Sequence, residues 1–420
     1  MDCPASSLES GTDIDVNHSR TTFICNDGEY FLRHRRQIAD TLAANGHDVT
    51  VLMGGPQLAP SRIGRWRYVN VPIERFRFHL ISDIVLFWAS LRELVVNRPR
   101  QVQLITLKPA IFAGLAAITA RMIGRGPERI VITIPGLGRL MAPASALDGR
   151  SARLMRGLVG FVIRFLSRRR NVWFTFETPD DRQHWLTLGY IREDTSLVVS
   201  GAGVDPAKFH PGDDRTGVPV MRVLFASRLL RAKGLDAFVD AARRLTTRND
   251  IEFVVAGMVE PHDPDGYPPE DLAAERSITF LGESAAMPDL LREVDVVCLP
   301  TRYGEGIPRI LIEAAASGLP CIASDADGCT YIVKHGVSGT IIPVAPVPEM
   351  VEQLIAAVER YSVEPDLRRR EGEAALAIFT DGDFAESAVT GRIVALLTGD
   401  EAATDDKHAD AAVHPSHTNI

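Results

Sequence analysis

Short apolar segments alternate with longer segments of helical periodicity along most of this chain, and the alternation runs twice. The first series of apolar segments covers residues 22–25, 49–53, 102–106, 130–134 and 172–176, and the second covers 220–226, 251–256, 296–299 and 321–324. Such alternation is typical of parallel sheets covered by helices on both faces. With 420 residues, the chain is long enough for two such units. We therefore predict an α/β fold with two doubly wound, Rossmann-like domains whose parallel sheets face each other across a cleft.

Composition marks the boundaries of these domains. Residues 206–219 hold three Pro and two Gly, which predicts a linker between an N-terminal domain at 20–205 and a C-terminal domain at 220–380. We expect a helix at 381–398 to pack back on the N-terminal domain. Residues 1–19 contain four acids and no base, and residues 399–420 lack periodicity, so both ends are predicted to be disordered.

The two halves of the chain carry opposite charge. The formal net charge of −8 by itself argues against a nucleic-acid partner. Residues 20–210, however, contain 27 Lys and Arg against 15 Asp and Glu, whereas residues 211–420 contain 19 against 35. The basic half therefore predicts an anionic partner, such as a diphosphate-bearing lipid at an anionic membrane surface.

Cysteine usage and hydropathy bear on the compartment. The five Cys form no C-x-x-C pair, which favours a reduced environment. Residues 1–15 lack a basic start followed by an apolar core, so we expect no secretory signal. The longest apolar runs, such as 110–120, are far shorter than the roughly 20 residues that span a bilayer. We expect a cytoplasmic protein or one bound peripherally to the inner face of the cell membrane.

Two carboxylates flank a predicted anion site in the C-terminal half. Strand 296–299 leads into a loop with Glu305 and Gly306 and then into a helix beginning near Pro308. The free amides of a first helical turn attract anions, and Gly306 permits close approach of a ligand. Glu305 and Glu313 can accept hydrogen bonds from sugar hydroxyls. The alternative is that one glutamate caps the helix and the other faces solvent.

Two cations follow the strand predicted at 220–226. Arg228 and Lys233 lie five residues apart, just before a helix, at the same sheet edge as the glutamate loop. Arg can clamp a diphosphate with two hydrogen bonds and Lys acts as a point charge. The alternative is a pair of basic residues on a solvated loop.

These motifs occur in a familiar order. SRLLRAKGL at 227–235 precedes GEGIPRILIEAAASGLPCIASD at 304–325, and TIPGLGR at 133–139 precedes TPDDR at 178–182. Together they resemble the family 4 glycosyltransferases of the GT-B fold, in particular the branch that builds bacterial lipid-linked oligosaccharides and surface polysaccharides, as in exopolysaccharide and lipopolysaccharide biosynthesis. The resemblance covers residues 21–397.

The resemblance implies a retaining transferase that moves a sugar from a nucleoside diphosphate, expected to be UDP, to a polyprenyl-diphosphate-linked saccharide. The donor site that it implies consists of Arg228, Lys233, Glu305, Gly306, Ile307 and Glu313. Arg228 and Lys233 would hold the diphosphate and ease departure of the leaving group, Glu305 would hold the transferred sugar, and Glu313 would bind the ribose. Arg228, Lys233 and Glu305 are thus the predicted catalytic residues. No cofactor and no metal are implied, so the aspartate pairs 263/265, 325/327 and 381/383 are interpreted as turn residues, with metal binding as the alternative.

The acceptor side departs from the family pattern. Where relatives often carry two His, this chain has Gln103 and Ile105. We assign His34, Lys108 and Gly136 to the acceptor side. The alternative for His34 is a histidine at a helix start bonded to backbone.

Residues 151–170 form a predicted basic amphipathic helix. Arg153, Arg156, Arg164 and Arg168 share one side, and the opposite arc holds Leu154, Leu158, Phe161, Val162, Phe165 and Leu166. Such a helix is typical of a membrane-surface element. The alternative, which the resemblance favours for the apolar arc, is packing on the domain's own sheet, with the arginines left to face lipid or a polyprenyl diphosphate.

Two other functions stay open at this point. One is a nucleotide-sugar epimerase on the same two-domain plan, which the lack of an acid/base pair near Glu305 and the basic front half disfavour. The other is a nucleotide-sugar-binding protein without catalysis, which Gln103 and Ile105 motivate.

Overall fold

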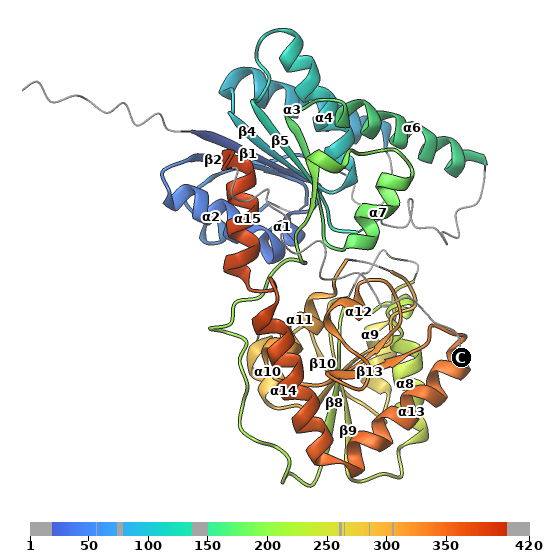
Figure 1. The fold of residues 1–420 in the computed structure, drawn as a ribbon. Helices are drawn as coiled ribbons and strands as arrows, with labels where there is room; N and C mark the ends of the chain where they lie inside the picture. Colours follow the sequence, from blue (N-terminus) through green and yellow to red (C-terminus); the bar gives the residue numbers. More distant parts are fainter. Residues whose placement is uncertain are drawn as a thin grey trace, which may run out of the picture.

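The computed structural model contains two parallel sheets, each covered by helices on both faces (Figure 1). It describes residues 19–55, 57–73, 79–136, 150–259, 263, 265–284, 286–304 and 306–400. The strand order is β3-β2-β1-β4-β5-β6-β7 in the first sheet and β10-β9-β8-β11-β12-β13 in the second. All the strand pairs of both sheets are parallel. The predicted fold class is confirmed.

The first sheet lies in the upper half of Figure 1. Its strands are β1 (Arg20–Cys25), β2 (Asp48–Met53), β3 (Arg67–Asn70), β4 (Gln101–Ile105), β5 (Arg129–Ile134), β6 (Val172–Phe176) and β7 (Ser196–Val198). Its helices are α1 (Gly28–His34), α2 (Arg36–Ala44), α3 (Leu80–Asn97), α4 (Leu107–Met122), α6 (Arg150–Ser167) and α7 (Pro179–Thr187). Apolar side chains of α3, α4 and α6 form one core with the sheet, and α1 and α2 form a second core on its other face.

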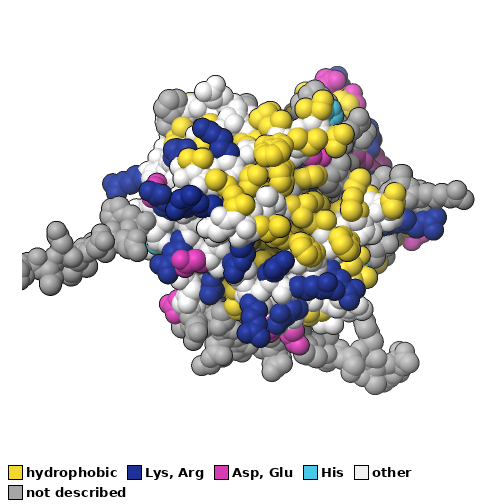
Figure 2. Space-filling view, turned by 90° about the horizontal axis from the view of Figure 1, so that it is seen from above, with side chains coloured by type: hydrophobic (Ala, Val, Ile, Leu, Met, Phe, Trp, Pro, Cys, Tyr) yellow, Lys and Arg dark blue, Asp and Glu magenta, His cyan; other side chains and the backbone are white. Residues whose placement is uncertain are grey.

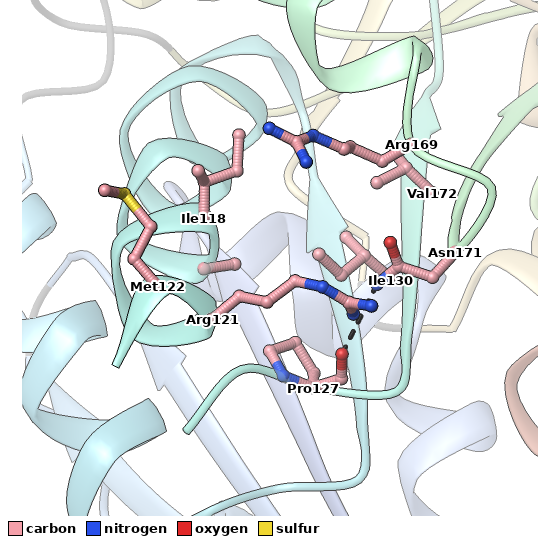
Figure 3. Close-up of a pocket in the computed structure, with 9 residues that line it drawn as sticks. Ile118, Arg121, Met122, Pro127, Ile130, Arg169, Asn171 and Val172 are labelled. Atoms are coloured by element: carbon pink, nitrogen blue, oxygen red, sulfur yellow. Dashed lines mark hydrogen bonds between the residues drawn. The ribbon is translucent and has the colours of Figure 1, made fainter. Parts of the chain in front are cut away.

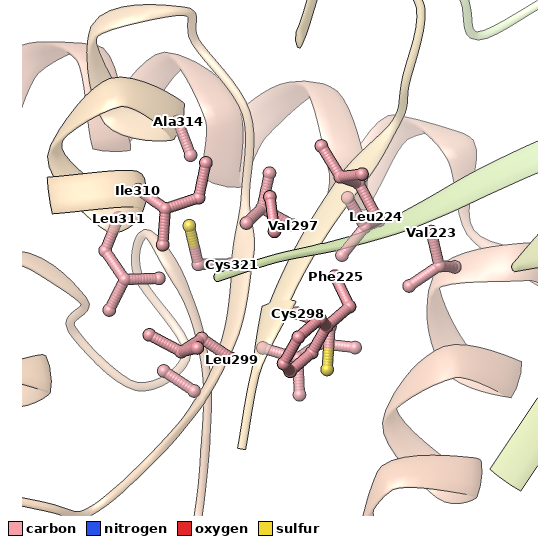
Figure 4. Packing of buried hydrophobic residues seen from close by; sticks show 14 of the residues in the cluster. Val223, Leu224, Phe225, Val297, Cys298, Leu299, Ile310, Leu311, Ala314 and Cys321 are labelled. Carbon is pink, nitrogen blue, oxygen red and sulfur yellow. The ribbon is translucent and has the colours of Figure 1, made fainter. Parts of the chain in front are cut away.

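The second sheet is built on the same plan. Its strands are β8 (Met221–Ala226), β9 (Ile251–Ala256), β10 (Thr279–Gly282), β11 (Val296–Leu299), β12 (Cys321–Ser324) and β13 (Gly339–Ile342). Its helices are α8 (Leu235–Arg244), α9 (Pro269–Ala274), α10 (Met287–Arg292), α11 (Arg309–Ala316), α12 (Cys329–Ile332), α13 (Val347–Val363) and α14 (Pro365–Asp381). Apolar residues of β8, β11 and α11 interlock in its core (Figure 4).

The last helix, α15 (Glu386–Thr398), returns to the first sheet. Val389, Ile393, Leu396 and Leu397 are buried in the same core as α1 and α2. Two backbone hydrogen bonds fasten its start, from the Val204 amide to Phe384 and from the Glu386 amide to Val204. The chain therefore crosses between the two sheets twice.

The helix predicted within 32–44 is two helices that meet at Arg35. α1 begins earlier, because the Asp27 side chain accepts a hydrogen bond from the Tyr30 amide at 3.1 Å and caps it. Arg35, with φ −134°, separates α1 from α2 and turns its guanidinium inward to Glu177, at 2.7 Å. His34 therefore ends α1, and the alternative that placed it at a helix start is wrong.

The apolar arc of α6 packs on the sheet only in part. Val162 and Leu166 are buried, but Leu154, Leu158 and Phe161 are exposed by 77%, 58% and 70%. Packing on the domain's own sheet therefore accounts for only one edge of that arc.

Candidate functional site

The order of strands reverses between β8 and β11 in the second sheet, and the loops that follow these two strands form the candidate site. Ligands of doubly wound sheets bind at the carboxyl ends of the strands at such a reversal. Gly234, with φ +80°, ends the loop after β8 and begins α8. A Cβ atom there would lie 2.0 Å from the Pro300 carbonyl oxygen at the end of β11. Only glycine lets the two loops approach so closely.

Tyr303 joins the two predicted cations. Its hydroxyl accepts a hydrogen bond from Nη2 of Arg228 at 3.0 Å, and Nζ of Lys233 lies 5.0 Å from the centre of its ring. Lys233 is only 4% exposed. The structure thus brings Arg228 and Lys233 together on one aromatic side chain. Tyr303 was not among the residues that we predicted for the site, although it stands directly before the glycine-rich loop.

The glycine-rich loop lies against the first domain. A Cβ atom on Gly306 would lie 2.1 Å from Oε2 of Glu177 and 2.3 Å from the Pro135 carbonyl oxygen. Gly306 and Ile307 are buried, and Gly136 follows Pro135 beside them. Glu305, predicted to hold the transferred sugar, lies outside the described residues.

Glu177 is a second residue that the sequence reasoning missed. It directly follows β6 and forms a buried ion pair with Arg35. Arg35 also lies 3.4 Å from the Tyr30 hydroxyl and from the Gly201 carbonyl. Arg35 thus compensates the buried carboxylate charge of Glu177 beside Gly306.

Glu313 is buried in α11 and accepts a hydrogen bond from Nε of Arg309 at 2.7 Å. Burial raises the pKa of Glu313, and the Arg309 guanidinium opposes that shift. Arg309 also donates a hydrogen bond across the cleft to the backbone carbonyl of Arg33. Arg33 in turn pairs with Glu283 of the second domain at 2.5 Å.

His34 lies close to several arginine side chains of both domains. Burial lowers the pKa of His34 well below its usual value, and the positive charges of Arg309, Arg35, Arg33 and Arg228 add to the shift. Its ring stacks at a tilt on Tyr30, with 4.6 Å between ring centres. The imidazole is therefore neutral at neutral pH and can accept or donate a hydrogen bond.

Acidic groups of the two domains also meet across the cleft. Burial raises the pKa of Asp181 to about 6, and the nearby charges of Asp327 and Asp180 contribute. Burial and the Asp180 charge likewise raise the pKa of Asp327. Burial raises the pKa of Tyr331, and a hydrogen bond with Asp180 raises it further. Asp180 and Asp181 begin α7 in the first domain, so these contacts join both halves of the chain.

The interior of the first domain holds Lys108, which we predicted for the acceptor side, and Gln103 and Ile105, where relatives often carry His. Nζ of Lys108 forms a buried ion pair with Asp83 at 3.1 Å, which ties α4 to α3. Gln103 is fully buried and donates a hydrogen bond to Thr133, and Ile105 is buried in the core. The two positions where relatives often carry His are thus core positions of β4 here, and the acceptor role of Lys108 stays a prediction.

One member of each aspartate pair makes a hydrogen bond or ion pair with another segment of the chain. Asp265 accepts a hydrogen bond from the Ala232 amide at 2.8 Å and so fastens the loop that carries Lys233. Asp325 accepts one from the Val344 amide, and Asp383 pairs with Arg392. Among the described residues, no group of three or more His, Cys, Asp or Glu side chains is placed to hold a metal ion.

A cavity of about 220 Å³ lies away from this site, between the end of α4 and the start of β5 and β6 (Figure 3). Ile118, Met122, Ile130 and Val172 line it with the guanidinium groups of Arg121 and Arg169. Asn171 hydrogen-bonds to the Pro127 carbonyl at its base. Because these strands begin there, the cavity is at the sheet edge opposite the cleft.

Residues 221–360 match the family model described as Glycosyl transferases group 1. Alpha-D-kanosaminyltransferase of Streptomyces kanamyceticus is 33% identical over 161 residues, which are 36% of this chain and 39% of that protein. A UDP-Gal:alpha-D-GlcNAc-diphosphoundecaprenol alpha-1,3-galactosyltransferase of Escherichia coli is 28% identical over 176 residues, 39% of this chain and 45% of that protein. The matched segment thus spans less than half the length of either relative.

Solved structures match nearly the whole fold. Sucrose-phosphate synthase from Thermosynechococcus elongatus superposes with a TM-score of 0.70 at 18% identity, covering 92% of this chain and all of the other. Anabaena HepE in complex with UDP and glucose gives a TM-score of 0.68 at 17% identity, with 91% of this chain and all of the other covered. These likenesses establish the two-domain GT-B architecture.

Proposed function

We propose that this chain, which carries a group 1 glycosyl transferase domain within a GT-B fold, transfers a sugar from a nucleoside diphosphate donor to a lipid-linked saccharide. The arrangement of Arg228 and Lys233 around Tyr303 carries the proposal. Two cations preorganised at the reversal of strand order suit a diphosphate whose negative charge grows as the sugar departs. UDP is the proposed nucleotide, supported by the HepE structure that holds UDP.

The remaining donor contacts follow from the same loops. The Gly306 and Ile307 amides precede α11, where the helix dipole favours a phosphate. Glu313 accepts the Arg309 hydrogen bond through Oε1, which leaves Oε2 to accept ribose hydroxyls. We assign Glu305 to the transferred sugar and retention of configuration to the reaction.

The acceptor would enter along the first domain, past His34 and Gly136. The close approach of Gly306 to Glu177 and Pro135 supports a reaction site shielded from water, which would protect the donor from hydrolysis. A relative named as acting on a diphosphoundecaprenol-linked sugar supports a polyprenyl-diphosphate-linked acceptor. The reaction would then take place on the cytoplasmic face of a membrane, in polysaccharide or oligosaccharide assembly.

One assay tests this function. The protein is incubated with labelled UDP-sugars and an extract of polyprenyl-diphosphate saccharides, and the label is followed into the lipid fraction. We expect transfer to lipid. Isomerisation of the donor without transfer would instead support an epimerase, and saturable donor binding without turnover would support a protein that only binds. Either result would overturn the proposal.

A further inference from the structure

Two helices of the first domain expose large apolar side chains in straight stripes. On α6, Leu154, Leu158 and Phe161 follow at intervals of four and three residues and are mostly exposed. On α3, Ile81, Ile84 and Trp88 follow at intervals of three and four, and Trp88 is 61% exposed. Residues at these spacings share one face of a helix.

Helix α4 lies between these stripes, since it packs against both α3 and α6. Met122 at its end is 82% exposed, and Leu115 and Ile118, on the same side, are half-buried. Figure 2, which looks down on the upper domain of Figure 1, shows apolar side chains gathered over this surface with arginine and lysine side chains beside them. The three helices thus present one broad apolar face, which we call the helical face; soluble proteins rarely expose so large a patch without a partner.

The charges on the helical face have one sign. The sequences of α3, α4 and α6 contain only two carboxylates, Asp83 and Glu93, and both are buried. They pair inward, with Lys108 and Arg67. The outward charged groups are arginines: Arg92, Arg121, Arg153 and Arg164 are exposed or half-buried, and Arg168 follows at the end of α6.

We propose that the helical face docks on an anionic lipid bilayer. A bilayer offers an acyl region for the apolar stripes and phosphate groups for the arginines, and each arginine near such a surface adds to the attraction. A second copy of the chain fits less well, because a symmetric contact would press arginines against arginines without a facing carboxylate. Within the part of the chain that the structure describes, no helix is long and apolar enough to span a bilayer.

The position of the face suits the proposed reaction. Helices α3 and α6 each follow a strand of the parallel sheet and so begin at the edge that faces the cleft. A protein docked through this face would place the first domain on the bilayer surface, from which a lipid-linked saccharide projects. This link to catalysis rests on the proposed function, whereas docking itself requires no donor sugar.

Vesicle flotation tests the docking. The full chain is mixed with phosphatidylcholine vesicles, with and without phosphatidylglycerol. An apolar variant carries Trp88→Ser, Leu158→Ser and Phe161→Ser, and a charge variant carries Arg153→Gln, Arg164→Gln and Arg168→Gln. Val363→Ser with Arg276→Gln, both exposed in the second domain, is the matched control. Circular dichroism and thermal melting establish that each variant is folded.

We expect the unaltered chain to float with phosphatidylglycerol vesicles and the control to match it. The charge variant should partition about tenfold or more weakly to anionic vesicles and show no change on neutral vesicles. The apolar variant should partition about tenfold or more weakly to every type of vesicle that binds the unaltered chain. Absence of flotation, or flotation unchanged in both variants, would overturn the proposal. The proposal would also be overturned if the unaltered chain did not bind vesicles and light scattering showed that it is a dimer, whereas the variants are monomers.

A transfer assay with a water-soluble acceptor separates this inference from the proposed function. A folded face variant that still transfers to the soluble acceptor but not to lipid-bound acceptor would show a docking defect. An unaltered chain that floats with the vesicles but transfers sugar to neither acceptor would count against the proposed reaction and leave docking in place.

Discussion

At the scale of single residues, the candidate site is organised by Tyr303. The sequence pattern identified Arg228 and Lys233 because cations after a strand of a parallel sheet collect at one edge. It did not identify Tyr303, because an aromatic residue before a glycine-rich loop is most often a packing residue. The hydrogen bond to Arg228 and the ring contact with Lys233 become visible only once two loops 70 residues apart are brought together.

Removal of the Tyr303 hydroxyl should weaken donor binding moderately. Tyr303→Phe loses a hydrogen bond of about 0.5–1.5 kcal/mol, so the Kd for UDP-sugar should rise about two- to tenfold. Tyr303→Ala should cost more, since the ring beneath Lys233 is lost as well. Isothermal titration calorimetry measures both. Tyr267→Phe is the control, because the Tyr267 ring contacts a different cation. The guanidinium of Arg231 lies 4.7 Å from the centre of that ring. Equal affinities for all three variants would remove Tyr303 from the site.

The buried carboxyl of Asp181 predicts a pH-dependent stability. Its folded pKa, about 6, is above that of an unfolded chain, so its protonated form stabilises the fold at low pH and this contribution is lost as pH rises through 6. Its Oδ2 atom is buried and accepts no hydrogen bond from the residues that the structure describes. Asp181→Asn should therefore raise the free energy of unfolding at pH 8, by up to about 3 kcal/mol, and make little difference at pH 4. Denaturation at the two pH values measures this; an equal effect at both would contradict the assignment.

At the scale of elements, some features followed directly from sequence periodicity and others did not. The strands at 130–134 and 172–176 were predicted close to their observed bounds, since continuous apolar runs bounded by polar segments have few other solutions. The break between α1 and α2 was missed, because it depends on the ion pair of Arg35 with Glu177, which lies 142 residues away in the sequence. The sequence left open whether the apolar stripe of α6 packs on the sheet or lies at a membrane surface, because amphipathic spacing does not distinguish a face that packs on a sheet from a face that contacts a partner.

The ion pair between α3 and α4 offers a test at this scale. Lys108→Met leaves Asp83 buried without its partner and should lower the free energy of unfolding by about 3–5 kcal/mol. Asp83→Leu combined with Lys108→Met should recover most of that loss, as measured by denaturant unfolding. If the folded double variant retains transfer, Lys108 acts in packing; if it is stable but inactive, the predicted acceptor role of Lys108 gains support.

At the scale of the whole molecule, two domains of opposite net charge contact each other, and the last helix of the chain packs on the first of them. Fold class could be predicted because the alternation of strands and helices indicates parallel sheets covered by helices, and the Pro- and Gly-containing segment at 206–219 divides it into two series. The contacts that close the cleft, from Arg309 to Arg33 and from Gly306 to Glu177, could not, since each joins loops whose relative placement depends on the whole fold. The net charge of −8 likewise concealed a basic domain with an apolar, arginine-bordered face.

The measurement that tests the central claim most directly is calorimetric binding of UDP-sugar to Arg228→Ala and Lys233→Ala. The neighbouring Arg231→Ala serves as control, since its side chain stacks on Tyr267 outside the site. We predict that each of the first two variants binds at least about tenfold more weakly, as expected for loss of a charge-assisted contact of about 1.5–3 kcal/mol, while the control binds like the unaltered chain. Unchanged affinity in both Arg228→Ala and Lys233→Ala would contradict a diphosphate site at the junction of β8 and β11.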